Sequence, residues 1–490
     1  MFPYVPSSSC WLYSFFSFLH HIAKKRSVMT NSRLAFAEKA CSYLSASTDP
    51  FHAVHQAIQK LEAAGFQALQ YRHNFPALQK GGKYYYTVHH STLVAFTVGN
   101  KVAKDDFGFH LIGGHTDSPN LAVKPNSKKP PKQGCVQLAV ACYGGGLWHT
   151  WFDRDLSISG KVLIRNGETL EPKLVQIRDP VARVSTLCIH LQSPDERAAF
   201  KVNTEDHTSP ILATTTTTAQ QELEKGATEQ LDAWQQGQEP ALMQRIAREL
   251  QVDVHQIADF ELSLYDTQPA AIGGLNQEFL YSARLDNLAT VFCAVEALAA
   301  HDPADDTDIA MICCFDHEEV GSVSSHGAGS PVMGEAIRRV SAALGVTELS
   351  TVKAKSFCLS IDQAHAVHPN YASKHDSQHA PVLNHGLVVK TNCNQRYTTN
   401  SLTGFVVREI ARQKDIPIQE FAVRNDCPCG STIGPTISAR LGIRVVDAGM
   451  PQLSMHSCRE VMGITDLSHG YNLFRGFFEN FRSIDNNIHD

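Results

Sequence analysis

Residues 309–322 read IAMICCFDHEEVGS, a stretch that leads an apolar strand directly into a dense group of titratable side chains. Seven apolar residues precede Asp316, His317, Glu318 and Glu319. Adjacent carboxylates repel one another, so grouping them where a buried strand leaves the core costs stability. A bound cation would reverse this repulsion. The stretch therefore predicts a charged functional site at the end of a core strand.

Similar apolar strands alternate with amphipathic helices through the second half of the chain. Strands are predicted at 356–361, 386–390 and 442–449, and helices at 287–300, 332–344 and 401–412. Continuous apolar strands between amphipathic helices are typical of a parallel sheet that is covered on both faces. We therefore predict an α/β fold with a mostly parallel sheet, whose ligands bind outside the carboxyl ends of the strands.

The pattern changes after Lys124, where PNSKKPPKQG (125–134) reads as a boundary loop. Apolar stretches and an Asn166-Gly167 turn then indicate antiparallel strands, followed by polar surface loops at 214–218 and 228–240 and a helix near 241–250. We expect a β-rich domain at 124–272, inserted into an α/β domain. The predicted domain ranges are 36–123 with 273–490 for the α/β domain, and 1–35 for a poorly ordered extension.

Composition excludes several function classes. The 490 residues carry a net charge of −6, which offers no basic surface for nucleic acid. The apolar run at 11–19 is too short to span a membrane, and the basic residues behind it leave organelle targeting open. The 13 cysteines include no CxxC pair, which favours a reducing compartment and hence the cytoplasm.

Five predicted strand ends carry residues that bind metals. Each residue alone has an ordinary explanation: a structural histidine, a helix cap, or a solvated glutamate pair. Their coincidence at one edge of one predicted sheet indicates a metal site instead. These residues are His115, Asp286, one glutamate of the pair Glu318 and Glu319, Asp362 and His456.

This ligand count suggests two divalent ions. With one bridging carboxylate, each ion receives three protein ligands and keeps an open position, as in catalytic centres. Two divalent ions and three carboxylates leave one positive charge, which a hydroxide would neutralise. Nitrogen and oxygen ligands suit Zn²⁺, Co²⁺ or Mn²⁺. One of Glu318 and Glu319 would then bind metal and the other would be the general base, and Asp117 would orient the imidazole of His115.

Six ordered motifs resemble those of the aspartyl aminopeptidases. They are HTDSP (115–119), RLDN (284–287), HEEVGS (317–322), DQAHAVHPNY (362–371), RNDCPCGSTIGP (424–435) and MHS (455–457). The resemblance runs from about residue 45 to the C-terminus. It implies a dinuclear zinc exopeptidase that removes N-terminal Asp or Glu from peptides and assembles into a large homo-oligomer, a dodecamer. The inserted domain would serve oligomerisation and cover the active site.

The resemblance also implies residue roles. His115 and Asp362 would bind one metal, Glu319 and His456 the other, with Asp286 bridging and Glu318 as base. The implied substrate contacts are His190, His365, Lys390 and Tyr397. His190 lies in the inserted segment and would reach a neighbouring subunit's site. Lys390 also follows GLVV at a predicted strand end, where a cation can pair with an acidic side chain.

Two other functions remain open at this point. A related dinuclear amidohydrolase acting on N-acyl amino acids would use the same metal ligands. A non-catalytic scaffold with the same fold is the second alternative. Glu318 argues against the scaffold, because a scaffold has no need of a general base.

Overall fold

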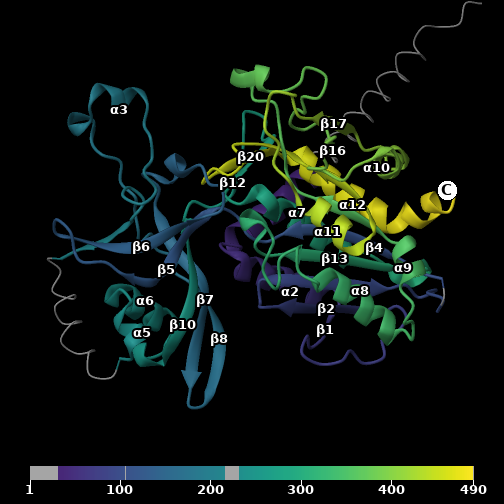
Figure 1. The fold of residues 1–490 in the computed structure, drawn as a ribbon, viewed down its shortest axis with the longest axis horizontal. Coiled ribbons are helices and arrows are strands. Elements are labelled where there is room, and N and C mark those ends of the chain that lie inside the picture. The colour runs from purple at the N-terminus through teal and green to yellow at the C-terminus, as the bar shows by residue number, and fades with distance from the viewer. Residues whose placement is uncertain (1–30, 105, 216–230, 489–490) are drawn as a thin grey trace, which may run out of the picture.

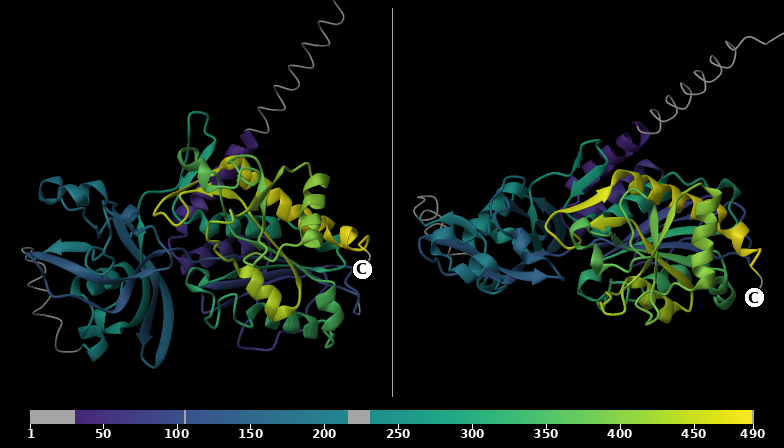
Figure 2. Two further views of the ribbon diagram at one scale, coloured as in Figure 1. Left: turned by 45° about the horizontal axis from the view of Figure 1, so that its top comes forward. Right: turned by 90° about the horizontal axis from the view of Figure 1, so that it is seen from above.

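The computed structural model describes residues 31–104, 106–215 and 231–488, which form two bodies side by side (Figures 1 and 2). The larger body is built on a nine-stranded sheet. Its spatial order is β1 (Gln67–Ala68), β2 (Lys83–Val88), β3 (Thr92–Val98), β13 (Ile309–Phe315), β4 (Phe109–His115), β14 (Phe357–Ile361), β18 (Arg444–Gly449), β16 (Leu387–Thr391) and β17 (Ile418–Ala422).

The four central strands β13, β4, β14 and β18 run parallel to one another. Their outer neighbours β3 and β16 run antiparallel to them, so the sheet is mixed at both sides. Every residue of β4, β13 and β14 is buried, as expected for strands that are covered on both faces. The predicted α/β class is confirmed.

Helices cover both faces of the sheet, and a hydrophobic core lies on each face. Successive residues of β13 point into opposite cores. Ile312 packs into the core under α2 (Pro50–Ala63), α7 (Leu285–Ala299), α10 (Ser401–Gln413) and α12 (Ile464–Asp485). Its neighbour Met311 packs into the core under α8 (Val332–Ala343), α9 (Ser350–Ala354) and α11 (Ile433–Leu441). Figure 1 shows these helices around the sheet.

A further helix occupies residues 31–46, ahead of α2. It buries Ala37, Ala40 and Leu44, whose spacing of three and four residues places them on one helix face. Residues 31–35 of the segment expected to be an extension are thus helical, and residues 1–30 lie outside the described part of the chain.

The smaller body is β-rich. Its antiparallel sheet has the order β8 (Thr169–Gln176), β7 (Leu156–Asn166), β10 (Ile257–Asp266), β5 (Asn120–Lys128), β6 (Cys135–Tyr143) and β9 (Ile211–Thr214). Helix α6 (Pro240–Leu250) packs on β8. The short helix α3 (Pro194–Ala198) projects from the far end of this body (Figures 1 and 2).

Two predicted loops differ from the structure here. Strand β5 continues to Lys128, through the first part of the expected boundary loop at 125–134. Helix α5 (Ala233–Gln236) lies within the expected loop at 228–240, because Trp234 packs on Phe260 with ring centroids 5.1 Å apart. Residues 216–230, which include parts of both predicted polar loops, lie outside the described residues.

A third, five-stranded sheet lies where the two bodies meet. Its order is β11 (Ala271–Gly273), β12 (Phe279–Ser282), β20 (Glu460–Gly463), β19 (Pro451–Leu453) and β15 (Ala364–His365). Figure 1 shows β12 and β20 between the β-rich body and the main sheet. Among the described helices, none combines the length and apolar character that crossing a membrane requires.

Candidate metal centre

His115 is the last residue of β4 and faces two carboxylates. Its Nε2 atom lies 3.3 Å from Asp286 Oδ1 and 3.5 Å from Asp362 Oδ1. Its Nδ1 atom donates to the main-chain carbonyl of Asp117 at 2.9 Å. That hydrogen bond fixes the ring tautomer and leaves the Nε2 lone pair directed at the carboxylates, as in metal-binding histidines.

A second imidazole approaches Asp286 from the other side. His456 Nε2 lies 3.4 Å from Asp286 Oδ2 and 3.4 Å from Glu319 Oε2. The Nδ1 atom of His456 donates to the carbonyl of Gly145 at 3.0 Å, so this ring is oriented in the same way. Two triads of potential ligands therefore share Asp286, one with His115 and Asp362 and one with Glu319 and His456.

These residues fit divalent ions. Two ligands about 2.0–2.2 Å from one tetrahedral ion lie about 3.3–3.6 Å apart, and the distances above match that spacing. Three buried carboxylate oxygens also lack a hydrogen-bond partner among the described residues: Asp286 Oδ1, Glu319 Oε1 and Asp362 Oδ1. Burying unpaired carboxylate oxygens is costly, and coordination of cations would satisfy them.

The two glutamates lie in the one-turn 3₁₀ helix Glu318–Val320 that follows β13. His317 has a φ of 62°, which turns the chain sharply before them. Glu319 faces Asp286 and His456, and Glu318 lies with His115 at the side of the cluster. Burial raises the pKa of Glu318 to about 8; His115 opposes this rise, and the carboxylates of Asp362 and Asp286 add to it.

Asp117 differs from its predicted role. Its carboxylate lies 3.5 Å from His115 Nδ1, which donates to the Asp117 carbonyl instead. The carboxylate accepts the backbone N–H groups of Glu318 and Glu319 at 3.0 Å each. It also accepts the Tyr143 hydroxyl at 2.7 Å. Asp117 therefore positions the glutamate turn with its side chain and His115 with its main chain.

The expectation that all ligands lie at the edge of one sheet is wrong. Asp286 follows β12 and His456 follows β19, and both strands belong to the third sheet. The strand direction assumed for Lys390 is also wrong, because β16 runs antiparallel to β18, although the Lys390 Nζ atom still lies 3.6 Å from Asp362 Oδ2. Apolar composition predicts a buried strand but does not fix its sheet or direction.

Two residues of the centre were not predicted from the sequence. Glu460 is buried and accepts the backbone N–H groups of Asp286 at 3.0 Å and of His456 at 2.8 Å. Tyr143, at the end of β6, brings the β-rich body into contact with Asp117. Neither residue lies in a pattern that signals chemistry, although Glu460 follows His456 by four residues.

The segment after Tyr143 packs against the ligands. A Cβ atom at Gly144 would lie 3.2 Å from Glu319 Cβ, and its φ of +76° is unfavourable for other residues. The backbone N–H of Leu147 also donates to the His456 carbonyl at 2.9 Å. The β-rich body therefore forms one wall of the centre.

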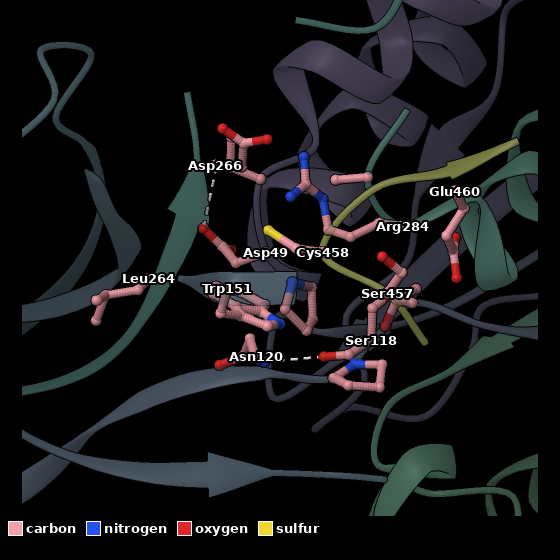
Figure 3. Close-up of a pocket in the computed structure, with 15 residues that line it drawn as sticks. Asp49, Ser118, Asn120, Trp151, Leu264, Asp266, Arg284, Ser457, Cys458 and Glu460 are labelled. Atoms are coloured by element: carbon pink, nitrogen blue, oxygen red, sulfur yellow. Dashed lines mark hydrogen bonds between the residues drawn. The ribbon is translucent and has the colours of Figure 1, made fainter. Parts of the chain in front are cut away.

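Figure 3 shows a small cavity that is lined by residues of both bodies. Trp151 and Leu264 of the β-rich body line it together with Arg284, Ser457 and Glu460. Its volume of about 20 Å³ is enough for about one water molecule. The two bodies are thus closely packed next to the ligands.

Three of the four predicted substrate contacts lie near Asp362. Lys390 Nζ donates to the Gln363 carbonyl at 2.8 Å and lies 3.6 Å from Asp362 Oδ2. The Tyr397 ring centroid is 5.4 Å from the same Nζ. His365 packs on the ring of Phe421, and burial, together with His375 and Lys390, lowers its pKa to about 4.

His190 is the exception. It is exposed in the 3₁₀ helix Ile189–Leu191, just before α3, at the end of the β-rich body that projects away from the main sheet (Figures 1 and 2). A single chain does not bring His190 to the centre.

Comparison with known proteins identifies the family of this chain. The sequence model of the family described as aminopeptidase I zinc metalloprotease (M18) matches residues 43–478. A probable aspartyl aminopeptidase of Ricinus communis is 43% identical, with 91% of this chain and 96% of that protein covered. Aspartyl aminopeptidase of Aspergillus oryzae is also 43% identical over the same shares of the two chains.

Two solved structures are also similar. A chain in the cryo-EM structure of the Ape4 and Nbr1 complex is 39% identical with a TM-score of 0.89, covering 94% of this chain and 89% of that one. The S. cerevisiae mApe1 dodecamer is 28% identical with a TM-score of 0.79, covering 92% and 98%. The chain thus belongs to the M18 family of zinc metalloproteases and is a metallo-aminopeptidase.

Proposed function

We propose that this enzyme hydrolyses the first peptide bond of peptides that begin with Asp or Glu, using two divalent ions. The observation that carries the proposal is the pair of ligand triads that share Asp286. Relatives named aspartyl aminopeptidase support the acidic specificity. His115 and Asp362 would hold one ion and Glu319 and His456 the other. Zn²⁺ suits these ligands and the family, although Co²⁺ or Mn²⁺ would also fit them.

Bound zinc ions would supply positive charge that lowers the pKa of water and polarises the scissile carbonyl. Glu318 then has the position of the general base, beside His115 and Glu319 but outside both shared triads. Its carboxylate takes a proton from the attacking water and returns a proton to the nitrogen of the leaving peptide. Asp117 holds the backbone of Glu318 and Glu319 in place for both transfers.

Lys390 is proposed to bind the acidic side chain of the substrate's N-terminal residue. Its ammonium group is almost fully buried and donates one N–H to the Gln363 carbonyl. The remaining N–H groups can bind a substrate carboxylate beside Asp362. Tyr397 packs next to this ammonium group, and His365 is held in its neutral form close by.

We further propose a dodecamer in which His190 completes the centre of a neighbouring subunit. The exposed position of His190 supports this, as do the exposed apolar neighbours Leu187, Ile189 and Leu191. The related mApe1 forms a dodecamer. The cysteines of the described residues are all unpaired, which supports a reducing cytoplasmic location.

The test is a substrate panel with the purified enzyme before and after chelation. Asp-X and Glu-X dipeptides should be cleaved far faster than Ala-X, and chelation should abolish cleavage until zinc is restored. Preferred cleavage of N-acetyl-aspartate would instead identify the enzyme as an amidohydrolase of N-acyl amino acids. No turnover of either class by the zinc-loaded enzyme would indicate a scaffold.

A further inference from the structure

We propose that Asp316, His317 and His326 form a third metal site, which takes a zinc-type divalent cation and shares no ligand with the catalytic centre. The nitrogen or oxygen atoms that these three residues offer lie within 4.8 Å of one another. His326 Nε2 is 3.6 Å and His317 Nε2 3.8 Å from the same oxygen, Asp316 Oδ2. Two imidazoles and a carboxylate are a donor set that suits Zn²⁺, Co²⁺ or Fe²⁺.

These separations do not correspond to hydrogen bonds. An N–H···O bond has its heavy atoms about 2.7–3.2 Å apart, whereas ligands of one ion are about 3.3–3.6 Å apart. The distances of 3.6 and 3.8 Å exceed those in the catalytic triads by only a few tenths of an ångström. Small side-chain shifts would therefore bring all three groups onto one ion.

The other nitrogen of each imidazole already has a partner. His317 Nδ1 lies 2.8 Å from the Ser324 hydroxyl, and His326 Nδ1 lies 3.2 Å from the Ser325 hydroxyl. Contacts of this kind orient metal-binding histidines and leave Nε2 for the ion. In both rings Nε2 is the atom that faces Asp316.

The backbone also holds this arrangement in place. The buried Thr92 hydroxyl of β3 donates to the His326 carbonyl at 2.7 Å and accepts the Asp316 N–H at 3.0 Å. One side chain thus joins the end of β13 to the loop that carries His326. The site is therefore built before an ion arrives, which reduces the ordering cost of binding.

An ion has a route into this site and space for a further ligand. Asp316 and His317 line a cavity of about 520 Å³ between the two bodies, together with Tyr143 and Glu261. The His317 side chain is 29% exposed and that of His326 13% exposed. With three protein ligands, the ion would keep at least one position for water.

Such an ion would brace the catalytic turn. His317 immediately precedes Glu318, and its ring lies 6.3 Å from that of Tyr143, which donates to Asp117. Fixing His317 to the loop at His326 would therefore limit movement of the segment that bears both glutamates. Zinc at this site would stabilise the fold without taking part in the reaction.

The test compares zinc bound per chain across a series of buffered free zinc concentrations, by mass spectrometry of the dialysed full-length enzyme. The His326→Gln variant should bind one zinc fewer than the parent. Loss of a group that only orients a ligand lowers metal affinity about 10–100-fold, and loss of the ligand His326 should lower it more. His90→Gln provides a matched control, because His90 is an exposed histidine outside the triad. The control should bind as much zinc as the parent.

Equal zinc content in the parent and His326→Gln would overturn the proposal, whatever the number of catalytic ions. Thermal unfolding provides a second measurement. Added zinc should raise the Tm of the parent more than that of His326→Gln, since an ion that binds only the folded state stabilises it. If His326→Gln does not fold, Asp316→Asn in the same two assays decides the question, with the same outcomes.

Discussion

The carboxylate of Asp117 accepts the backbone N–H of Glu318 at 3.0 Å, and its second oxygen accepts that of Glu319 at the same distance. A residue two positions after the ligand His115 thus fixes the turn that carries the proposed base. The same carboxylate accepts the Tyr143 hydroxyl from the β-rich body. The end of β4, the turn with Glu318 and Glu319, and the β-rich body therefore meet at Asp117.

This contact predicts a defect in Asp117→Asn. The amide cannot accept all the hydrogen bonds that the carboxylate accepts, so the glutamate turn should shift. We expect kcat to fall about 10–100-fold, as for other partners that orient ligands. Steady-state kinetics should show Tyr143→Phe, which removes only one of these bonds, to be milder. A Tyr143→Phe defect larger than that of Asp117→Asn would contradict this ordering.

Glu318→Gln should abolish most turnover and leave bound zinc nearly unchanged. Loss of a general base costs about 10²–10⁴-fold in rate, and Glu318 lies outside the triads that share Asp286. The measurements are kcat on an Asp-X dipeptide and zinc content by mass spectrometry. Activity within a few-fold of the parent would remove Glu318 from the mechanism.

Lys390→Met should reduce kcat/KM for Asp-X far more than for Ala-X. Removing one partner of a buried ion pair costs about 2–5 kcal/mol, and 2 kcal/mol corresponds to about a 30-fold change in the ratio. The ratio of the two kcat/KM values is the readout. Equal losses on both peptides would mean that Lys390 serves mainly to hold Asp362, which lies 3.6 Å away. The exposed Arg396 would then be tested as the reader of the acidic side chain.

Asp308→Asn should destabilise the fold in a pH-dependent way. Burial opposes ionisation of Asp308, but His110 and Arg482 hold its pKa far below the usual value. Arg482 donates to both carboxylate oxygens, at 2.6 and 2.9 Å. Because the folded pKa is lowered, this contribution is complete above the unfolded pKa of about 4 and is lost as the pH falls further.

Denaturant unfolding of the parent and Asp308→Asn should therefore differ by about 1.5–3 kcal/mol at neutral pH, the usual contribution of a hydrogen bond to a charged group. The difference should shrink below about pH 4, where Asp308 of the unfolded parent takes up a proton while the folded pair stays ionised. A difference that grows as the pH falls would contradict the assigned direction of the pKa shift.

Local signals in the sequence were enough to predict individual elements. Helix α2 begins at Pro50, directly after an Asp that can cap it, and the Asp49 carboxylate accepts the His52 N–H at 3.0 Å. Strand β13 matches the apolar run 309–315. Both depend on residues within a few positions of one another, where capping and burial act directly.

Contacts between segments that are far apart in the sequence could not be predicted from local patterns. The direction of β16 and the membership of β12 in the third sheet depend on tertiary packing, so the sequence argument misplaced Lys390 and Asp286 within the sheets. The hydrogen bond between Glu460 and the backbone of Asp286 joins residues far apart in the sequence, and that with the backbone of His456 closes a loop. Neither contact follows from a local pattern. Even so, the sequence motifs identified the residues of the centre, and the structure brings six of them together. They are His115, Asp286, Glu318, Glu319, Asp362 and His456.

Asp286→Ala should lose zinc as well as activity, because its carboxylate belongs to both triads. Two zinc ions bound at the catalytic centre of this variant, counted in a crystal at the zinc absorption edge, would contradict its bridging role.

Anomalous diffraction from the zinc-loaded parent tests the central claim most directly. The account predicts two anomalous peaks at the centre, one between Asp286, His115 and Asp362 and one between Asp286, Glu319 and His456. A single peak, or peaks that leave Asp286 uncoordinated in a fully active crystal, would contradict a dinuclear centre bridged by this residue.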